Sequence, residues 1–246
     1  MTAITPRGIE INADAALPFE AIRVAQQLLR TTRTIALATL DPSGYPYNTV
    51  TNFICEPDGT ALFYVSGLAV HARNIERDNR IAVTVAEASN DVLTTPRLTL
   101  VGRALRVGEA EIDAVKTRYQ ATFPKAKLYL ALRDTALYRV DVESVQLNGG
   151  PARNANDVLP MHLRVDLSDA EDLMTGLDET LQRLNTDGLP EKLATLANAK
   201  ADRWHVVSLD PNGIDLASAG AVARYWLPER IRTKAELDLL IETWRR

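Results

Sequence analysis

The spacing of apolar residues changes from helical to strand-like close to the start of the chain. Between Phe19 and Arg33, apolar residues recur on one helical face, at Ile22, Ala25 and Leu28. From there on, short runs rich in β-branched residues alternate with Pro, Gly and Asp turns, which is typical of antiparallel strands. We predict strands over residues 34–40, 46–54, 61–65, 81–86, 97–107 and 136–147, and helices over residues 70–77, 109–123 and 126–133.

The order of these elements favours a barrel. Consecutive strands are joined by tight turns rather than by helices, so a parallel sheet is not expected. Helices occur only at the ends and corners of the strand pattern, which is more typical of a barrel than of a sandwich. Gly102, inside a long strand, predicts a bulge or bend. We therefore expect a six-stranded antiparallel barrel.

A second pattern begins after Gly149-Gly150-Pro151. Ser168 and Glu171 have the spacing of a capping box, which would open a helix carrying a leucine face at residues 173, 177, 181 and 184. A short helix follows, and a second capping box, Thr233 with Glu236, would open the last helix. Three strands are predicted over residues 204–209, 214–217 and 222–227. The expected organisation is a leader (1–18), the barrel (19–150), a linker (151–167) and a small α-α-β-β-β-α domain (168–246), an α+β, mostly β chain.

Composition narrows the class of protein. The 246 residues are 46% hydrophobic and 24% charged, which is ordinary for a globular protein. The net charge of −4 argues against nucleic acid as the main partner. A single cysteine, Cys55, allows no intrachain disulfide and suits a reducing compartment. With no signal-peptide pattern and no run of about 18 apolar residues, we expect a soluble cytoplasmic protein that does not span a membrane.

Standard catalytic motifs are absent from the sequence. There is no phosphate-binding GxxxxGK[ST], no HExxH, no CxxC pair and no GxSxG. Three scattered histidines, His71, His162 and His205, do not predict a zinc site. If the protein is an enzyme, which the sequence leaves uncertain, we expect a cofactor to supply the chemistry.

The stretch from Ser66 to Asn74 is the most informative for binding. A loop that runs from a strand into a helix start exposes backbone N–H groups, which suit a phosphate or carboxylate, and His71 and Arg73 add donors. The alternative is a solvated helix face with His71 at the edge of the core. Arg97, at the head of a strand, has the same ambiguity, since an edge strand commonly carries an arginine.

Several segments together resemble a known family. They are residues 24–53, 61–85 and 96–107, with the S-x-L-A-x-H-x-x-N-I pattern at Ser66–Ile75 and the PRLTLVG block at Pro96–Gly102. The resemblance is to the pyridoxamine-phosphate-oxidase-like FMN-binding split β-barrels, most closely to their haem-utilisation (HugZ-type) branch. It covers about residues 19–148, and residues 168–246 resemble the small C-terminal domain of that branch.

The resemblance implies a ligand site and a homodimer. In the family the site is built from two chains, and in one isolated barrel we expect Tyr45, Tyr47 and Phe53 to be poorly covered. The ligand would be FMN or haem, with the phosphate of FMN beside the Ser66–Arg73 loop. The implied cofactor-binding residues are Thr49, Val50, Thr51, Asn52, Ser66, His71, Arg73 and Arg97.

Two departures from the family pattern bear on the ligand. Val70-His71 stands where the oxidases carry an Arg-Lys pair on the phosphate, so one fixed positive charge is missing and the other is titratable. Relatives also carry two histidines in the C-terminal domain, where this chain has Arg183 and Gly188. If haem binds, its iron needs another ligand, and His71 is our candidate because it lies in the ligand-binding loop.

Three functions remain open at this point. The first is a haem-utilisation protein that binds haem at the barrel dimer interface and supports its oxidative breakdown. The second is an FMN-dependent oxidoreductase acting on a small molecule. The third is a non-catalytic ligand-binding or regulatory protein on the same fold.

Overall fold

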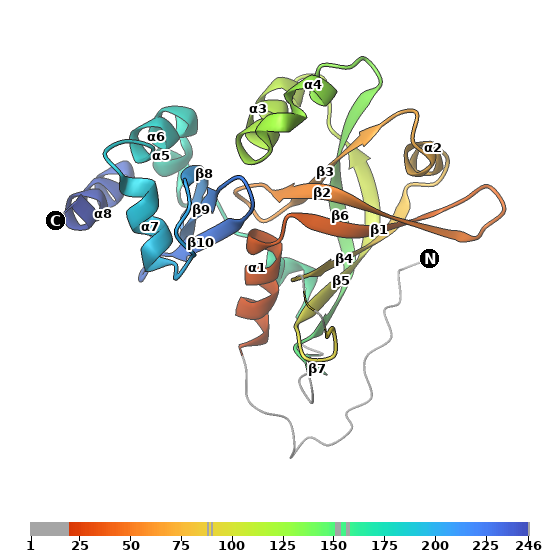
Figure 1. Cartoon of the computed structure of the whole chain (residues 1–246), viewed down its shortest axis with the longest axis horizontal. Coiled ribbons are helices and arrows are strands. Elements are labelled where there is room, and N and C mark those ends of the chain that lie inside the picture. Colours follow the sequence, from red (N-terminus) through yellow and green to blue (C-terminus); the bar gives the residue numbers. More distant parts are fainter. Residues whose placement is uncertain (1–19, 88, 90, 151–153, 156–157, 246) are drawn as a thin grey trace.

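Six antiparallel strands close into a barrel, as expected. The computed structural model describes residues 20–87, 89, 91–150, 154–155 and 158–245. The strand order is β3-β2-β1-β4-β5-β6, and β6 pairs back with β3 to close the barrel (Figure 1). The strands are β1 (Thr34–Leu40), β2 (Pro46–Cys55), β3 (Ala61–Ser66), β4 (Arg80–Ala86), β5 (Arg97–Arg106) and β6 (Thr135–Asn148), with a short β7 (Asn154–Ala155) paired to β6.

The barrel core follows from strand alternation. Alternate residues of β1 and β4, such as Leu37 and Val83, point inward and are fully buried. The predicted irregularity at Gly102 is confirmed by a register shift between β5 and β6, and a Cβ there would lie 1.9 Å from the Asp141 carbonyl oxygen. One expectation was wrong: Phe53 is only 1% exposed, because β2 changes its partner from β1 to β3 at this residue and turns the ring into the core.

Helices cover the outside and the ends of the barrel. They are α1 (Ala21–Thr31), α2 (Val70–Arg77), α3 (Ile112–Thr122) and α4 (Lys127–Leu130), the last preceded by a 3-10 turn at Pro124–Ala126 and shorter than predicted. On α1 the apolar face is buried at Ala25 and Leu28, but Ile22, which we assigned to that face, is 37% exposed. Tyr119 of α3 is buried against Leu62 and Leu137, so α3 packs on the outside of the barrel wall.

The C-terminal region has its own sheet and core. Its helices are α5 (Glu171–Met174), α6 (Leu177–Leu184), α7 (Leu189–Leu196) and α8 (Lys234–Arg245), and its sheet, in the order β10-β9-β8, consists of β8 (His205–Asp210), β9 (Gly213–Ala217) and β10 (Val222–Trp226). The capping box of α8 is confirmed, since the backbone N–H of Glu236 donates to the Thr233 hydroxyl and the Glu236 carboxylate accepts from Thr233. We call residues 168–245 the C-terminal module.

The other predicted capping box is wrong. Ser168 makes no side-chain cap, and α5 begins at Glu171 after Ala170. The neighbouring Asp169 is instead held by Arg230 and Arg232, which turns the chain away from the cap geometry. The single leucine-faced helix is also split in two, with Gly176 at a φ of +66° between α5 and α6.

Parts of the predicted linker pack on the barrel. A 3-10 helix, Pro160–Leu163, places Leu163 in the barrel core beside Val158. The backbone N–H of Val165 donates to the carbonyl of Asp58 at 2.8 Å. Among the described residues, none of the helices has the length and apolar character needed to cross a bilayer. The predicted leader, residues 1–18, lies outside the described residues.

Candidate functional site

The loop between β3 and α2 is held in place by Asp134. The Ser66 hydroxyl donates to the Asp134 carboxylate at 2.7 Å, and the backbone N–H of Gly67 donates to the Asp134 carbonyl at 2.7 Å. These bonds fix the point at which the chain leaves β3 and enters α2. The first N–H groups of α2 have no partner within the helix, so they face outward from a fixed position.

Helix α2 lies against β1, β2 and β3 at one end of the barrel. Ala72 and Ile75 enter the barrel core, and the Asn74 amide donates to the Thr39 hydroxyl at 3.0 Å. His71 precedes Asn74 by three residues, so it lies on the same side of the helix. It is half-buried, and burial lowers the pKa of His71 below its ordinary value of 6.5. Burial therefore favours the neutral form of the imidazole.

Strand β2 divides the predicted ligand strand between two faces. Thr49 and Thr51 pair with inward-facing residues of β1, and the Thr51 hydroxyl donates to the Tyr64 carbonyl of β3 at 3.3 Å. These two threonines therefore point to the side on which α2 lies. Val50 and Asn52 point to the opposite, outer face of the sheet, where Val50 is 70% exposed.

The two predicted arginines lie in different places. Arg73 is exposed on α2, beside His71 in sequence. Arg97 begins β5, three strands from β2 in the sheet order, which corresponds to about 14 Å at the usual strand spacing. Its guanidinium donates to the Val92 carbonyl at 2.6 Å. Within one chain, the α2 end of the barrel therefore contains Thr49, Thr51, Ser66 and the His71–Arg73 turn. Arg97 lies apart from them.

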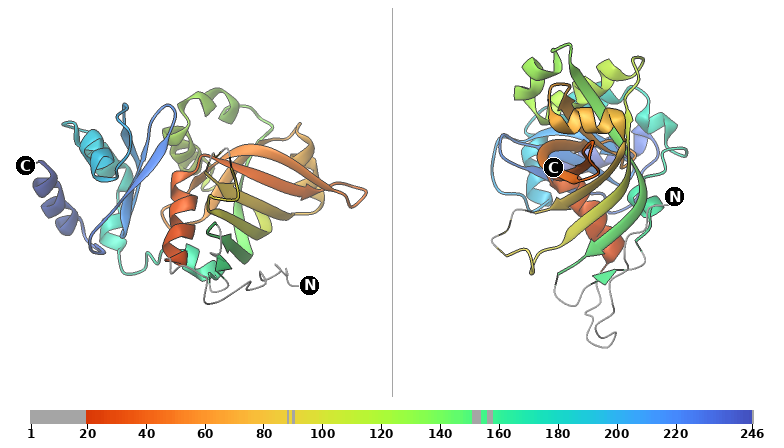
Figure 2. Two further views of the ribbon diagram at one scale, coloured as in Figure 1. Left: turned by 60° about the horizontal axis from the view of Figure 1, so that its bottom comes forward. Right: turned by 90° about the vertical axis from the view of Figure 1, so that its right-hand side faces the viewer.

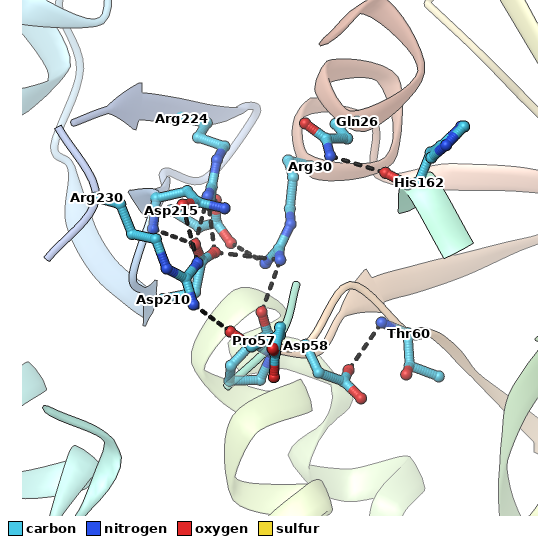
Figure 3. Close-up of polar contacts among 12 residues, drawn as sticks. Gln26, Arg30, Pro57, Asp58, Thr60, His162, Asp210, Asp215, Arg224 and Arg230 are labelled. Carbon is cyan, nitrogen blue, oxygen red and sulfur yellow. Dashed lines mark hydrogen bonds and ion pairs between the residues drawn. The ribbon is translucent and has the colours of Figure 1, made fainter. Parts of the chain in front are cut away.

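The three histidines differ in what their rings contact. Nδ1 of His162 accepts the backbone N–H of Leu159 at 3.1 Å, and Nε2 of His205 lies 2.7 Å from the Ala121 carbonyl oxygen, so that nitrogen donates. The side-chain amide of Gln26 also donates to the backbone carbonyl of His162 at 2.8 Å (Figure 3). Within the described part of the chain, His71 is the one histidine whose ring nitrogens make no hydrogen bond. Its ring is half-buried.

Exposed apolar side chains gather near the α2 loop. Leu68 is 82% exposed and Leu128 is 78% exposed. Tyr129 and Leu132 are each at least half exposed. The segment of α4 adjoins the loop because Thr135, which pairs with Ser66, donates its hydroxyl to the Tyr129 carbonyl at 2.5 Å. We call Leu68, Val70, Leu128, Tyr129 and Leu132 the apolar rim. Where exposed apolar side chains form a contiguous patch, the patch commonly marks a site that binds a ligand or another chain.

The places of the family's missing histidines are structural here. Arg183, on α6, pairs with Asp238 of α8 at 2.5 Å on the surface. Gly188 caps α7 at a φ of +69°, a conformation that favours glycine. Neither position offers a group that could bind a metal ion.

The most deeply buried polar cluster is one that sequence reasoning missed. Arg30 of α1 and Arg224 of β10 both bridge Asp210 and Asp215 of the module sheet, with N–O distances from 2.6 to 3.1 Å (Figure 3). All four residues are less than 9% exposed. Two positive and two negative charges balance, so each buried ion is compensated.

Further contacts of α1 extend this junction. The guanidinium carbons of Arg23 and Arg224 lie 3.4 Å and 4.1 Å from the centre of the Trp226 ring. Trp226 also donates its indole N–H to Gln27 at 2.5 Å. Helix α1 therefore lies between the barrel and the module sheet and joins the two (Figures 1 and 2). We call the four buried ions and Trp226 the α1–module junction.

Comparison with known proteins agrees with this fold. The sequence profile described as pyridoxamine 5'-phosphate oxidase matches residues 23–149. The chain belongs to this split-barrel family. A protein of unknown function from Agrobacterium tumefaciens is 50% identical, with a TM-score of 0.88 and 99% of both chains covered. This similarity includes the C-terminal module.

Two other relatives bear names that mention haem. The non-canonical heme oxygenase HOZ of Arabidopsis thaliana chloroplasts is 32% identical over 109 residues, which is 44% of this chain and 33% of that protein. The chain thus matches about a third of the length of this curated relative. A heme binding protein from Mycobacterium smegmatis has a TM-score of 0.54 at 22% identity, with 94% of this chain and 98% of that chain covered. At that identity it shares the fold.

Proposed function

We propose that this protein binds haem at the α2 end of the barrel, with His71 as the protein ligand to the iron. One observation carries the proposal: His71 is half-buried and has both ring nitrogens free of hydrogen bonds to described residues. A neutral imidazole is the form that binds metal ions, and burial favours that form at His71. The similarity to the plant heme oxygenase supports the choice of haem over other ligands.

The other histidines fit this role less well. Nδ1 of His162 already accepts the Leu159 N–H, so Nε2 of His162 could bind iron only if that hydrogen bond were broken by a change of tautomer or the ring lost its one N–H proton. His205 has its Nε2 occupied by a carbonyl between the barrel and the module. His71 carries neither constraint.

The surroundings of His71 suit a large, flat, mostly apolar molecule with two carboxylates. Leu68 and Val70 of the apolar rim offer exposed apolar surface within three residues of the histidine, and Thr49 and Thr51 carry hydroxyls on the inward-facing side of β2. Arg73, one residue beyond Ala72 on the same helix turn, is placed to pair with a propionate at the edge of the site. When bound, haem would supply the iron at which oxygen reacts, and participation in its oxidative breakdown is part of the proposal.

A second copy of the chain completes this proposal. Tyr45 is 71% exposed and Val50 is 70% exposed on the β1–β2 hairpin. The outward residues of β1 and β4 beside them are small, as at Ala36 and Ala82, so another chain could approach this face closely. Symmetric pairing is the commonest arrangement of soluble homo-oligomers, and Arg97 would then reach the site from the second chain. Light scattering should give the mass of a dimer, and a monomer at micromolar concentration would contradict this part.

FMN is the second candidate, because the family's name and the free N–H groups at the start of α2 favour a phosphate ligand. The neutral form of His71 weakens it, since Arg73 is then the one fixed positive charge of the Ser66–Arg73 loop. The test is the absorbance spectrum of the purified protein, reconstituted separately with haem and with FMN. We expect a Soret band that titrates to one haem per chain. A bound flavin spectrum without haem binding would overturn the proposal, and binding of neither would favour a non-catalytic role for the fold.

A further inference from the structure

Asn74 is a buried polar residue that sits one helical turn after His71. It is 3% exposed, and its partner Thr39 is 2% exposed. The Asn74 amide donates to the Thr39 hydroxyl at 3.0 Å, and that hydroxyl donates onward to the Tyr47 carbonyl at 3.5 Å. A short chain of bonds thus links α2 to β1 and then to β2.

This link joins the two elements on which the proposed haem site is built. At one end is the helix that carries His71, and at the other is the strand that continues from Tyr47 to Thr49. The rest of the contact between α2 and the strands is apolar, through Ala72 and Ile75. Apolar packing holds a helix against a sheet but is not directional, whereas a buried hydrogen bond specifies one rotation of the helix about its axis.

The rotation of α2 decides where the His71 ring points. Residues three positions apart on a helix lie on neighbouring parts of one face, so fixing Asn74 against β1 also fixes the direction of His71. The ring itself has no hydrogen bond to hold it. Histidines that bind metals are usually oriented through a bond from their second nitrogen, and here the orientation would have to come from the backbone that carries the ring.

We propose that Asn74 is the positioning residue of the haem site, because its buried bond to Thr39 fixes the turn of α2 that directs the His71 imidazole toward the ligand. This inference rests on the proposed function, and one of the two arms of its test needs no haem. Asn74 does not touch the iron, and it acts through the helix. Thr39 is the other partner in this hydrogen bond.

The first arm of the experiment uses protein loaded with haem. Asn74→Leu and Thr39→Val each remove the bond while keeping side-chain size nearly constant. Both variants should lose most of the spectroscopic difference that separates the wild-type protein from His71→Ala. Thr39→Ser keeps the hydroxyl and should restore the wild-type spectrum, which a loss of packing alone would not explain.

The second arm needs no haem. The ring resonances of His71 are followed by NMR in the ligand-free protein and are assigned by their loss in His71→Ala. The ring is half-buried, so a helix free to turn should weaken the nuclear Overhauser contacts between the ring and its neighbours in Asn74→Leu and Thr39→Val. Thr39→Ser should keep the wild-type contacts.

Asn185→Leu is the matched control. Asn185 also bridges two elements through its amide, since it donates to the Val206 carbonyl at 2.9 Å in the C-terminal module. This variant should lose stability and leave both the haem spectrum and the NMR contacts of the His71 ring unchanged. An unchanged spectrum and unchanged ring contacts in Asn74→Leu would overturn the inference. If the wild-type protein binds no haem, the proposed function fails, and the NMR arm alone decides whether Asn74 positions His71.

Discussion

The two ends of the barrel differ in whether their buried polar groups have partners. At the end that faces the C-terminal module, Arg30, Asp210, Asp215 and Arg224 are buried together and every charge is paired. At the end covered by α2, His71 is half-buried with no hydrogen bond from its ring, next to apolar side chains that remain exposed. Paired groups at one end indicate a fixed structural junction. The half-buried ring without a hydrogen bond at the other end is the feature on which the proposed haem site rests.

The largest effect should come from breaking the α1–module junction. Arg30→Met removes one cation and leaves the two buried aspartates with a single partner. Losing one member of a buried ion pair typically costs about 3–5 kcal/mol of the free energy of unfolding. Chemical denaturation checks this value.

Arg183→Met is the matched control, because Arg183 pairs with Asp238 on the surface, with both side chains about half exposed. It should cost about 0–1 kcal/mol, as exposed pairs do. Equal losses in the two variants would mean that the junction is no more important for stability than a surface ion pair.

Haem binding at the α2 end of the barrel should depend on pH. The pKa of His71 lies below 6.5 because burial disfavours the charged ring, and iron binds the neutral ring. Haem affinity should therefore rise with pH below that pKa, by up to about tenfold per pH unit, and stay flat above it. A phosphate ligand that needs the charged ring would give the opposite slope. Titrations of haem from pH 5 to 8 should show the rise in the wild-type protein and none in His71→Ala.

A related effect should appear in the stability of the ligand-free protein. Between the lowered pKa of folded His71 and its ordinary value near 6.5, the unfolded chain binds more protons than the folded one. The contribution of His71 to the free energy of unfolding therefore increases with pH across this window. Comparing wild-type protein with His71→Ala by denaturation at several pH values isolates this contribution, and parallel curves would contradict it.

The smallest effect should come from Arg73. As an exposed partner for a propionate, it should contribute modestly, and Arg73→Ala should weaken haem binding about two- to fivefold. If FMN were the ligand, losing a donor to its phosphate should cost about tenfold or more. Arg77→Ala, on the same helix one turn further on, is the control and should change neither affinity.

Local patterns in the sequence were sufficient to predict the barrel. Strand alternation, the bulge at Gly102 and the capping box of α8 each depend on residues close together in the chain, and all three are confirmed. The capping box at Ser168 failed because distant arginines hold Asp169 in another turn. Phe53 was misassigned because the exchange of strand partners along β2 leaves no local signal.

The two candidate regions also differ in whether residues close together in the chain could predict them. The loop around His71 was proposed as a ligand site from a contiguous motif and stays a prediction, whereas the direction of the His71 ring could not be predicted. The α1–module junction could not be found, because Arg30 and Asp215 lie 185 positions apart and Asp210 reads as an ordinary turn residue. Gly213 is expected in a turn after Asp210, and the fold adds a second reason for it, since a Cβ there would lie 2.8 Å from the Arg224 guanidinium.

The proposed role of His71 is tested by reconstituting the wild-type protein and its three histidine variants with haem and recording their Soret and ligand-field bands. We expect His71→Ala to lose the spectrum of a histidine-bound haem and to bind haem at least about tenfold more weakly, the effect of losing about 1.4 kcal/mol or more. His162→Ala and His205→Ala should keep the wild-type spectrum. If His71→Ala keeps it as well, His71 is not the iron ligand and the proposed site at α2 is wrong.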